Sequence, residues 1–102
     1  MIKARRKGNR NRHIVITHFQ DNGYEVDVVE KTSRFAKQKD LFGLWDLIAL
    51  KGTELIFIQV STNTNHPHKV FWEWAKLHCS NKVRAVQVVV VDRKGLKFHW
   101  YM

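Results

Sequence analysis

The chain has 102 residues, and its 18 lysines and arginines outnumber its nine aspartates and glutamates, which gives a net charge of +9. This length suits one small domain, and no apolar run approaches the roughly 20 residues that a membrane-spanning helix needs. A single cysteine, Cys79, excludes a disulfide within the chain and suits a reducing compartment. The basic excess indicates a polyanionic partner, with nucleic acid favoured over a membrane surface; a solvated basic face is the simpler alternative.

The most basic part of the chain is its beginning. The first twelve residues include Lys3, Arg5, Arg6, Lys7, Arg10 and Arg12. No apolar stretch of the kind found in secretory signals follows them, so we expect the protein to stay in the cytoplasm. We expect one domain over residues 1–102, in which residues 1–8 form a basic and flexible arm.

A first helix is predicted over residues 9–21. Val15, Ile16 and Phe19 supply its inner side, and Asn22-Gly23 supplies a stop signal. Apolar and polar residues then alternate over residues 24–30, which predicts a half-buried strand. Residues 31–39 are polar and basic, and we expect a loop there.

A tight hairpin is predicted next, because two apolar, β-favouring runs at 44–50 and 55–60 flank a turn signal around Gly52. A turn centred on Gly52 and Thr53 sets Asp46 opposite Gln59. Ser61 follows Gln59 on the same face, since strand side chains alternate. Burying such polar groups without partners is costly. A metal ion or a substrate is one candidate partner, and a bond between Asp46 and Gln59 is the alternative.

A second helix is predicted from Pro67, which suits the first turn of a helix, to about residue 78. Its predicted buried stripe consists of Val70, Phe71, Trp74 and Leu77. Its predicted outer side carries Lys69, Trp72, Glu73 and Lys76. Strands are predicted at residues 84–91 and 96–101, with a turn at 92–95 and with Leu96, Phe98 and Trp100 facing inward. The elements therefore follow the order αβββαββ.

The hairpin resembles the PD-(D/E)xK nuclease superfamily, in which an Asp begins one strand and Glu-x-Lys or Gln-x-Lys lies on the next. Asp46 matches the acid, and Gln59-Val60-Ser61 occupies the three-residue motif. The DLFG segment before Asp46 and the FIQVS run are similar to small phage and prophage proteins of the Holliday junction resolvase-like branch. This resemblance covers most of the chain. It implies a restriction-endonuclease-like αβββαββ core, with a mixed central sheet flanked by helices, and a bacterial, archaeal or phage-infected cell as the setting.

The resemblance also implies a Mg²⁺-dependent or Mn²⁺-dependent endonuclease that acts on branched or distorted DNA as a homodimer. Asp46, the amide oxygen of Gln59 and the backbone carbonyl of Val60 are the implied metal ligands. With one carboxylate among them, the ion should bind weakly until DNA phosphates complete its shell. The alternative is a nuclease-fold protein that binds DNA without cutting it, because Gln59 and Ser61 stand where the family commonly has Glu and Lys.

Two further catalytic roles are open. Asp40 and Glu30 are candidates for a second acid, although either could instead cap a turn or lie on the surface. The family's lysine stabilises charge that develops on the phosphate, and Ser61 takes its position here. Lys69, Lys37 or Lys39 could supply a displaced equivalent, or could simply contact phosphates.

Contacts to DNA phosphates are expected from the first helix and its arm, from the basic loop and from the start of the second helix. The residues concerned are Arg5, Arg6, Lys7, Arg10, Arg12, Arg34, Lys37, Lys39 and Lys69. Phe35 and Trp72 are candidates for stacking on unpaired bases, with a core or interface role equally open for Trp72. His66, His68, His78 and Cys79 do not follow the spacing of a structural zinc site.

Overall fold

The computed structural model describes residues 2–29, 42, 44–63 and 67–101, and it describes the side chains of the first helix from Arg10 onward. The elements are α1 (Ile2–Asp21), β1 (Glu25–Val28), β2 (Leu47–Lys51), β3 (Glu54–Thr62), α2 (His68–His78), β4 (Val83–Val91) and β5 (Gly95–Trp100). The predicted α/β class and the predicted order of elements are confirmed. Neither helix in this part of the chain has the length and apolar character to cross a membrane.

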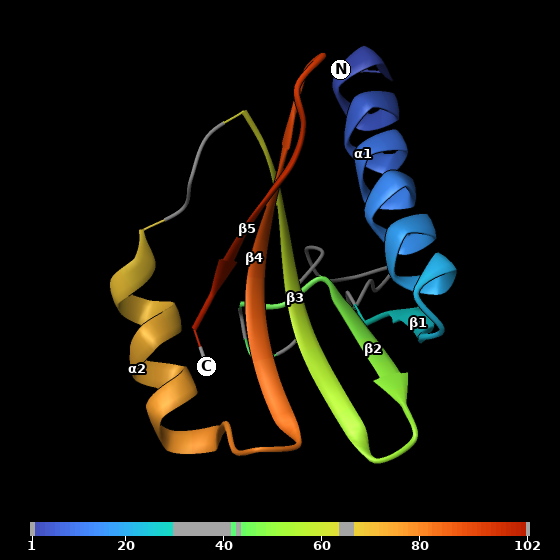
Figure 1. Cartoon of the computed structure of the whole chain (residues 1–102). Coiled ribbons are helices and arrows are strands. Elements are labelled where there is room, and N and C mark those ends of the chain that lie inside the picture. The colour runs from blue at the N-terminus through green and yellow to red at the C-terminus, as the bar shows by residue number, and fades with distance from the viewer. Residues whose placement is uncertain (1, 30–41, 43, 64–66, 102) are drawn as a thin grey trace, which may run out of the picture.

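The five strands form one mixed sheet in the order β1-β2-β3-β4-β5. Each neighbouring pair is antiparallel except β3 and β4, which are parallel. A parallel pair needs a long crossover connection, and α2 provides it. The two helices lie on opposite sides of the sheet (Figure 1). Alternate residues of each inner strand therefore contribute to two separate cores.

The core under α1 is aliphatic. Val15 and Phe19 of the helix pack on Leu47, Ala49, Ile56 and Ile58 and on the even-numbered valines of β4. Ile16 is partly buried at its margin. The predicted inner side of this helix is thus confirmed, and burial of this stripe stabilises the helix more than its basic sequence does.

The core under α2 is aromatic. Trp45 contacts the rings of Phe71 and Trp74, with centroid distances of 5.3 and 5.1 Å. Phe71 and Ala75, one helical turn apart, are the buried residues of α2. The prediction was wrong for Val70 and Leu77, whose exposed fractions are 50% and 80%. The bulky indole of Trp45 fixes which side of the helix meets the sheet, and that side is narrower than the predicted stripe.

Three other details differ from the prediction. The helix α1 begins at Ile2 and takes in most of the expected arm, because residues 2–7 are mostly good helix formers. The strand β3 continues to Thr62. Trp100 is exposed at the end of β5, where the guanidinium of Arg84 lies 4.1 Å from its ring centre, whereas Leu96 and Phe98 pack against the α1 core.

The packing of α2 gives a test of this arrangement. Phe71→Ala should lower the free energy of unfolding by about 3–5 kcal/mol, because it removes a buried ring that stacks on Tyr101. Leu77→Ala, on the exposed side of the same helix, should change it by less than about 0.5 kcal/mol. Urea denaturation of both variants measures the difference. Similar decreases at the two positions would contradict the observed orientation of the helix.

Candidate functional site

The hairpin that carries the predicted site has the predicted register. Leu47 pairs with Ile58, and Lys51 pairs with Glu54 across the turn. Gly52 occupies the turn with φ of 61°, a left-handed conformation that glycine adopts without strain. Gln59 and Ser61 therefore project from β3 on the same side as Phe57, toward α2.

The alternation of side chains breaks at Asp46. Trp45 packs in the core under α2, whereas Leu47 packs in the core under α1, although residues two apart in a regular strand share a face. The Asp46 N–H donates to the carbonyl of Ile58 at 2.9 Å, and its carbonyl accepts from Val29 N–H at 3.0 Å. Asp46 thus forms a bend at the start of β2, as a β-bulge would.

The backbone of Val60 links the two central residues of the predicted site. Its N–H donates to Asp46 Oδ2 at 2.8 Å. Its carbonyl oxygen accepts from Gln59 Nε2 at 3.1 Å. Asp46 therefore contacts the residues on both sides of Gln59, and its carboxylate points toward the backbone of β3. The two residues are neighbours, as the register predicts, but the contact runs through the peptide of Val60.

Several oxygen-bearing groups lie along β3 around Val60. The Asp46 carboxylate accepts from the Val60 N–H, the Val60 carbonyl accepts from the Gln59 amide nitrogen, and the Gln59 amide oxygen and the Ser61 hydroxyl belong to the residues on either side. Gln59 Oε1 and Ser61 Oγ are buried, and among the residues that the structure describes they have no hydrogen-bond partner. Hard oxygen donors of this kind fit Mg²⁺, which takes one or two carboxylates and completes its shell from elsewhere.

A row of polar side chains continues from Gln59 across the sheet under α2. Gln87 on β4 is the register partner of Gln59, and His99 on β5 is the register partner of Gln87. We call Gln59, Gln87 and His99 the polar row. Gln87 has an exposed fraction of 0%, and no described residue bonds either of its amide atoms or His99 Nε2. Each unpaired buried group opposes folding, which favours a role for the row beyond stability.

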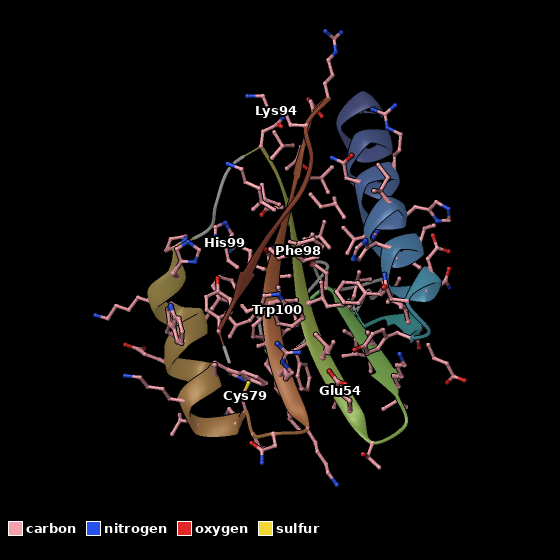
Figure 2. The ribbon with its side chains drawn as sticks, viewed as in Figure 1. Glu54, Cys79, Lys94, Phe98, His99 and Trp100 are labelled. Carbon is pink, nitrogen blue, oxygen red and sulfur yellow. The ribbon has the colours of Figure 1, made fainter. Side chains whose placement is uncertain are left out.

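The far end of the polar row meets the first turn of α2. His68 and His99 have ring centroids 5.1 Å apart, and Figure 2 shows His99 on the side of β5 that faces α2. His68 Nδ1 lies 2.8 Å from the hydroxyl of Tyr101. Burial raises the pKa of Tyr101 to about 12, so this phenol stays protonated near neutral pH. The bond between them joins α2 to the end of the sheet.

Sequence reasoning missed Gln87, His99 and Tyr101. The signal for Gln87 was present, because it is a single amide inside a run of apolar residues on β4. Such a residue on a strand buried on both faces needs an explanation. His99 and Tyr101 carry no comparable signal, since their neighbourhood depends on how β4 and β5 pair.

The structure describes only some of the other predicted site residues. Lys69 is exposed in the first turn of α2, next to His68, and Arg10 is exposed on α1. Arg5, Arg6 and Lys7 lie on α1, but their side chains are outside the described part. Glu30, Arg34, Phe35, Lys37, Lys39, Asp40 and His66 also lie outside the described residues. Trp72 is partly exposed and has an edge contact with the ring of Tyr101.

Within the described residues, histidine, cysteine and acidic side chains do not gather in groups of three or more that could hold a metal ion. Asp46 supplies the carboxylate that is hydrogen-bonded to Val60. Cys79 is half buried, and burial raises the pKa of its thiol, which lowers its reactivity near neutral pH.

The chain matches no protein-family model and no curated protein sequence. The geometry around Val60 and the distribution of charge are therefore the features of the chain that indicate a function.

The unpaired groups of the polar row predict that an apolar substitution within it increases stability. Gln87→Leu should raise the free energy of unfolding by about 1 kcal/mol, because it replaces an unpaired buried amide by an apolar group of similar size. Gln20→Leu, at an exposed position of α1, should have an effect within about 0.5 kcal/mol. Denaturant unfolding measures both. A decrease in the stability of Gln87→Leu would show that the amide is well bonded in the native protein.

Proposed function

We propose that this protein binds branched or distorted DNA and cleaves it with Mg²⁺ at the site formed by Asp46, Gln59 and the backbone of Val60. The observation that carries the proposal is the pair of hydrogen bonds that ties the Asp46 carboxylate and the Gln59 amide to one peptide. The order αβββαββ, with a parallel β3–β4 pair, supports a restriction-endonuclease-like core.

Each protein group has a definite part in this proposal. The Val60 N–H orients the Asp46 carboxylate, which supplies the negative charge for the ion. A carbonyl oxygen has two lone pairs, so Val60 O can accept from Gln59 and still coordinate a cation. Gln59 Oε1 would be the third protein ligand once the amide turns its oxygen, in place of Nε2, toward the Val60 carbonyl. Bound Mg²⁺ would polarise the scissile phosphate and lower the pKa of a bound water.

The charge of the protein supplies the affinity for DNA. Phosphate contacts by lysine and arginine dominate such binding and release counterions from the DNA. The basic half of α1 is the main source, and exposed Lys69 on α2 adds to it. A homodimer would suit a branched substrate, and it would cover one of the edge strands, β1 or β5.

A second candidate is a protein of the same fold that binds DNA without cutting it. One observation favours it: the described residues contain no group of three or more histidine, cysteine or acidic side chains that could hold a metal ion, and Ser61 stands where an ammonium group would stabilise the phosphate. Under this alternative, the hydrogen bonds around Val60 stabilise the bend at Asp46 and have no catalytic role.

The substitution Asp46→Asn distinguishes a nuclease from a protein that binds DNA without cutting it. The Asn side-chain oxygen can still accept from the Val60 N–H, so the bend should persist while the negative charge is removed. Cleavage in Mg²⁺ should fall by about 10²–10³-fold, as when a preorganised charge-stabilising group is removed. Affinity for DNA should hold or rise slightly, because a negative charge near the phosphates has gone.

The matched control is Asp27→Asn, an exposed position on β1 whose carboxylate bonds the N–H of its neighbour Val28 at 2.9 Å. It should cleave like the wild type. Undiminished cleavage by Asp46→Asn would contradict the proposed site. A wild-type protein that binds DNA but does not cut it would leave the second candidate.

The basic half of α1 gives a test of DNA binding itself. Replacing Arg5, Arg6 and Lys7 together by glutamine should weaken binding to all DNA sequences alike. The slope of log affinity against log salt should become shallower by about 1 for each phosphate that is no longer neutralised by a cationic side chain. Fluorescence anisotropy at several salt concentrations measures both. Affinity that is insensitive to salt, or to this change, would exclude phosphate binding by α1.

A further inference from the structure

An open groove lies between α1 and the end of the β4–β5 hairpin, with a volume of about 270 Å³. Arg10, Asn11 and Ile14 line it from the helix, and Arg93 and Leu96 line it from the hairpin. The groove lies at the end of the molecule where the basic half of α1 runs beside the β4–β5 turn (Figure 1). Its floor is apolar and its two walls each carry an arginine.

Both walls of this groove are fixed to consecutive residues at the end of β3. On the helix side, buried Asn11 donates from Nδ2 to Thr62 Oγ1 at 2.7 Å. On the hairpin side, Asn63 and Asp92 bond each other twice, through Asn63 Nδ2 to Asp92 Oδ2 and through Asp92 N–H to Asn63 Oδ1, both at 3.0 Å. These bonds hold the two walls at a set separation.

The turn that carries Arg93 is itself well defined. Lys94 N–H donates to the carbonyl of Val91 at 3.0 Å, which closes the turn. Arg93 has φ of 64°, a conformation that is uncommon outside glycine and asparagine. The turn therefore presents Arg93 and its exposed neighbour Lys94 in a fixed direction, and Figure 2 shows Lys94 at the basic end of the molecule.

The charge of the groove is positive. Arg10 and Arg93 are both exposed, one on each wall. The acid that lines the groove, Asp92, is bonded by Asn63. A guanidinium is planar and always charged, and its donors match the oxygens of a phosphate better than an ammonium does. Two such groups across an apolar floor suit a chain that alternates phosphates with less polar sugars.

We propose that this groove holds one strand of a nucleic acid by its phosphodiester backbone, between Arg10 and Arg93, with Lys94 on the adjoining phosphate. The proposal depends on the proposed function, because it assigns a surface to the same DNA. Thr62, the last residue of β3, and Asn63 follow Val60 by two and three residues along the chain, so the anchors of the groove lie within about 10 Å of Val60 at the rise of a strand. The groove opens on the α1 side of the sheet, whereas Gln59 and Ser61 face α2, so the groove would add a separate contact to DNA near the candidate site.

The hydrogen bonds that fix the two walls should also reduce the entropy that the groove loses when it binds a ligand. A binding surface that is already ordered loses less conformational freedom when the ligand arrives. The bonds from Asn11 and Asn63 supply that order without using the arginines themselves, whose side chains stay available for phosphate. The interaction is with the backbone of the nucleic acid, so it should not depend on base sequence.

The test is the double variant Arg93→Asn with Lys94→Gln. Asparagine tolerates the positive φ at position 93, so the turn should keep its shape. Binding of a fluorescent four-way junction should weaken by about tenfold at 150 mM salt, and the salt slope should become shallower by about 2, or about 0.9 for each phosphate concerned. The matched control, Lys76→Gln with Lys82→Gln, removes the same charge from exposed positions on α2 and before β4.

The possible results distinguish a failure of the proposed groove from a failure of the proposed function. The groove is supported if the Arg93 and Lys94 variant weakens binding and the control does not, with circular dichroism unchanged in both. Equal weakening by the two variants would show that only net charge matters, and would overturn the groove. If the wild type binds and the Arg93 and Lys94 variant binds equally well, the groove fails while DNA binding stands. If the wild type binds no DNA, the proposed function fails first.

Discussion

The hydrogen bond from the Val60 N–H to the Asp46 carboxylate is the interaction on which this architecture depends. It stabilises the bend at Asp46, and the bend sends Trp45 into the aromatic core under α2 and Leu47 into the aliphatic core under α1. A regular strand would put both side chains on one face, and would remove either Trp45 from the core under α2 or Leu47 from the core under α1. The same bend turns a carboxylate toward the backbone of β3. Packing and the candidate chemistry thus arise from one local irregularity.

The polar row opposes folding, since Gln59, Gln87 and His99 all bury groups that no described residue bonds. Burial of such groups costs about 1–3 kcal/mol each in proteins. The two apolar cores on either side of the sheet offset this cost. Folding alone gives no reason to keep two amides and an imidazole in register across three strands. A role at the neighbouring site does give one, because polar groups that are unfavourable for stability concentrate at functional sites.

Local patterns were enough to predict the order of elements, the inner side of α1 and the register of the hairpin, because each depends on residues close in sequence. They did not predict the bend at Asp46, where Trp45 and Leu47, two residues apart, enter the cores on opposite faces of the sheet. The polar row was missed because it depends on the parallel pairing of β3 with β4, which no local pattern sets. The exposure of Val70 and Leu77 follows from the contact with Trp45, a residue far away in the sequence. Asp40 and Glu30 lie outside the described residues.

Cleavage of defined DNA by the wild-type protein decides whether Asp46 serves a metal-dependent nuclease. The measurement compares four-way junction, duplex and single-stranded DNA of matched sequence, each with Mg²⁺, with Mn²⁺ and with a chelator. If the protein is such a nuclease, the junction is bound most tightly and is cut only when a divalent metal is present. Tight binding of the junction without cleavage in either metal would contradict it, and would leave Asp46 with a structural role at the bend.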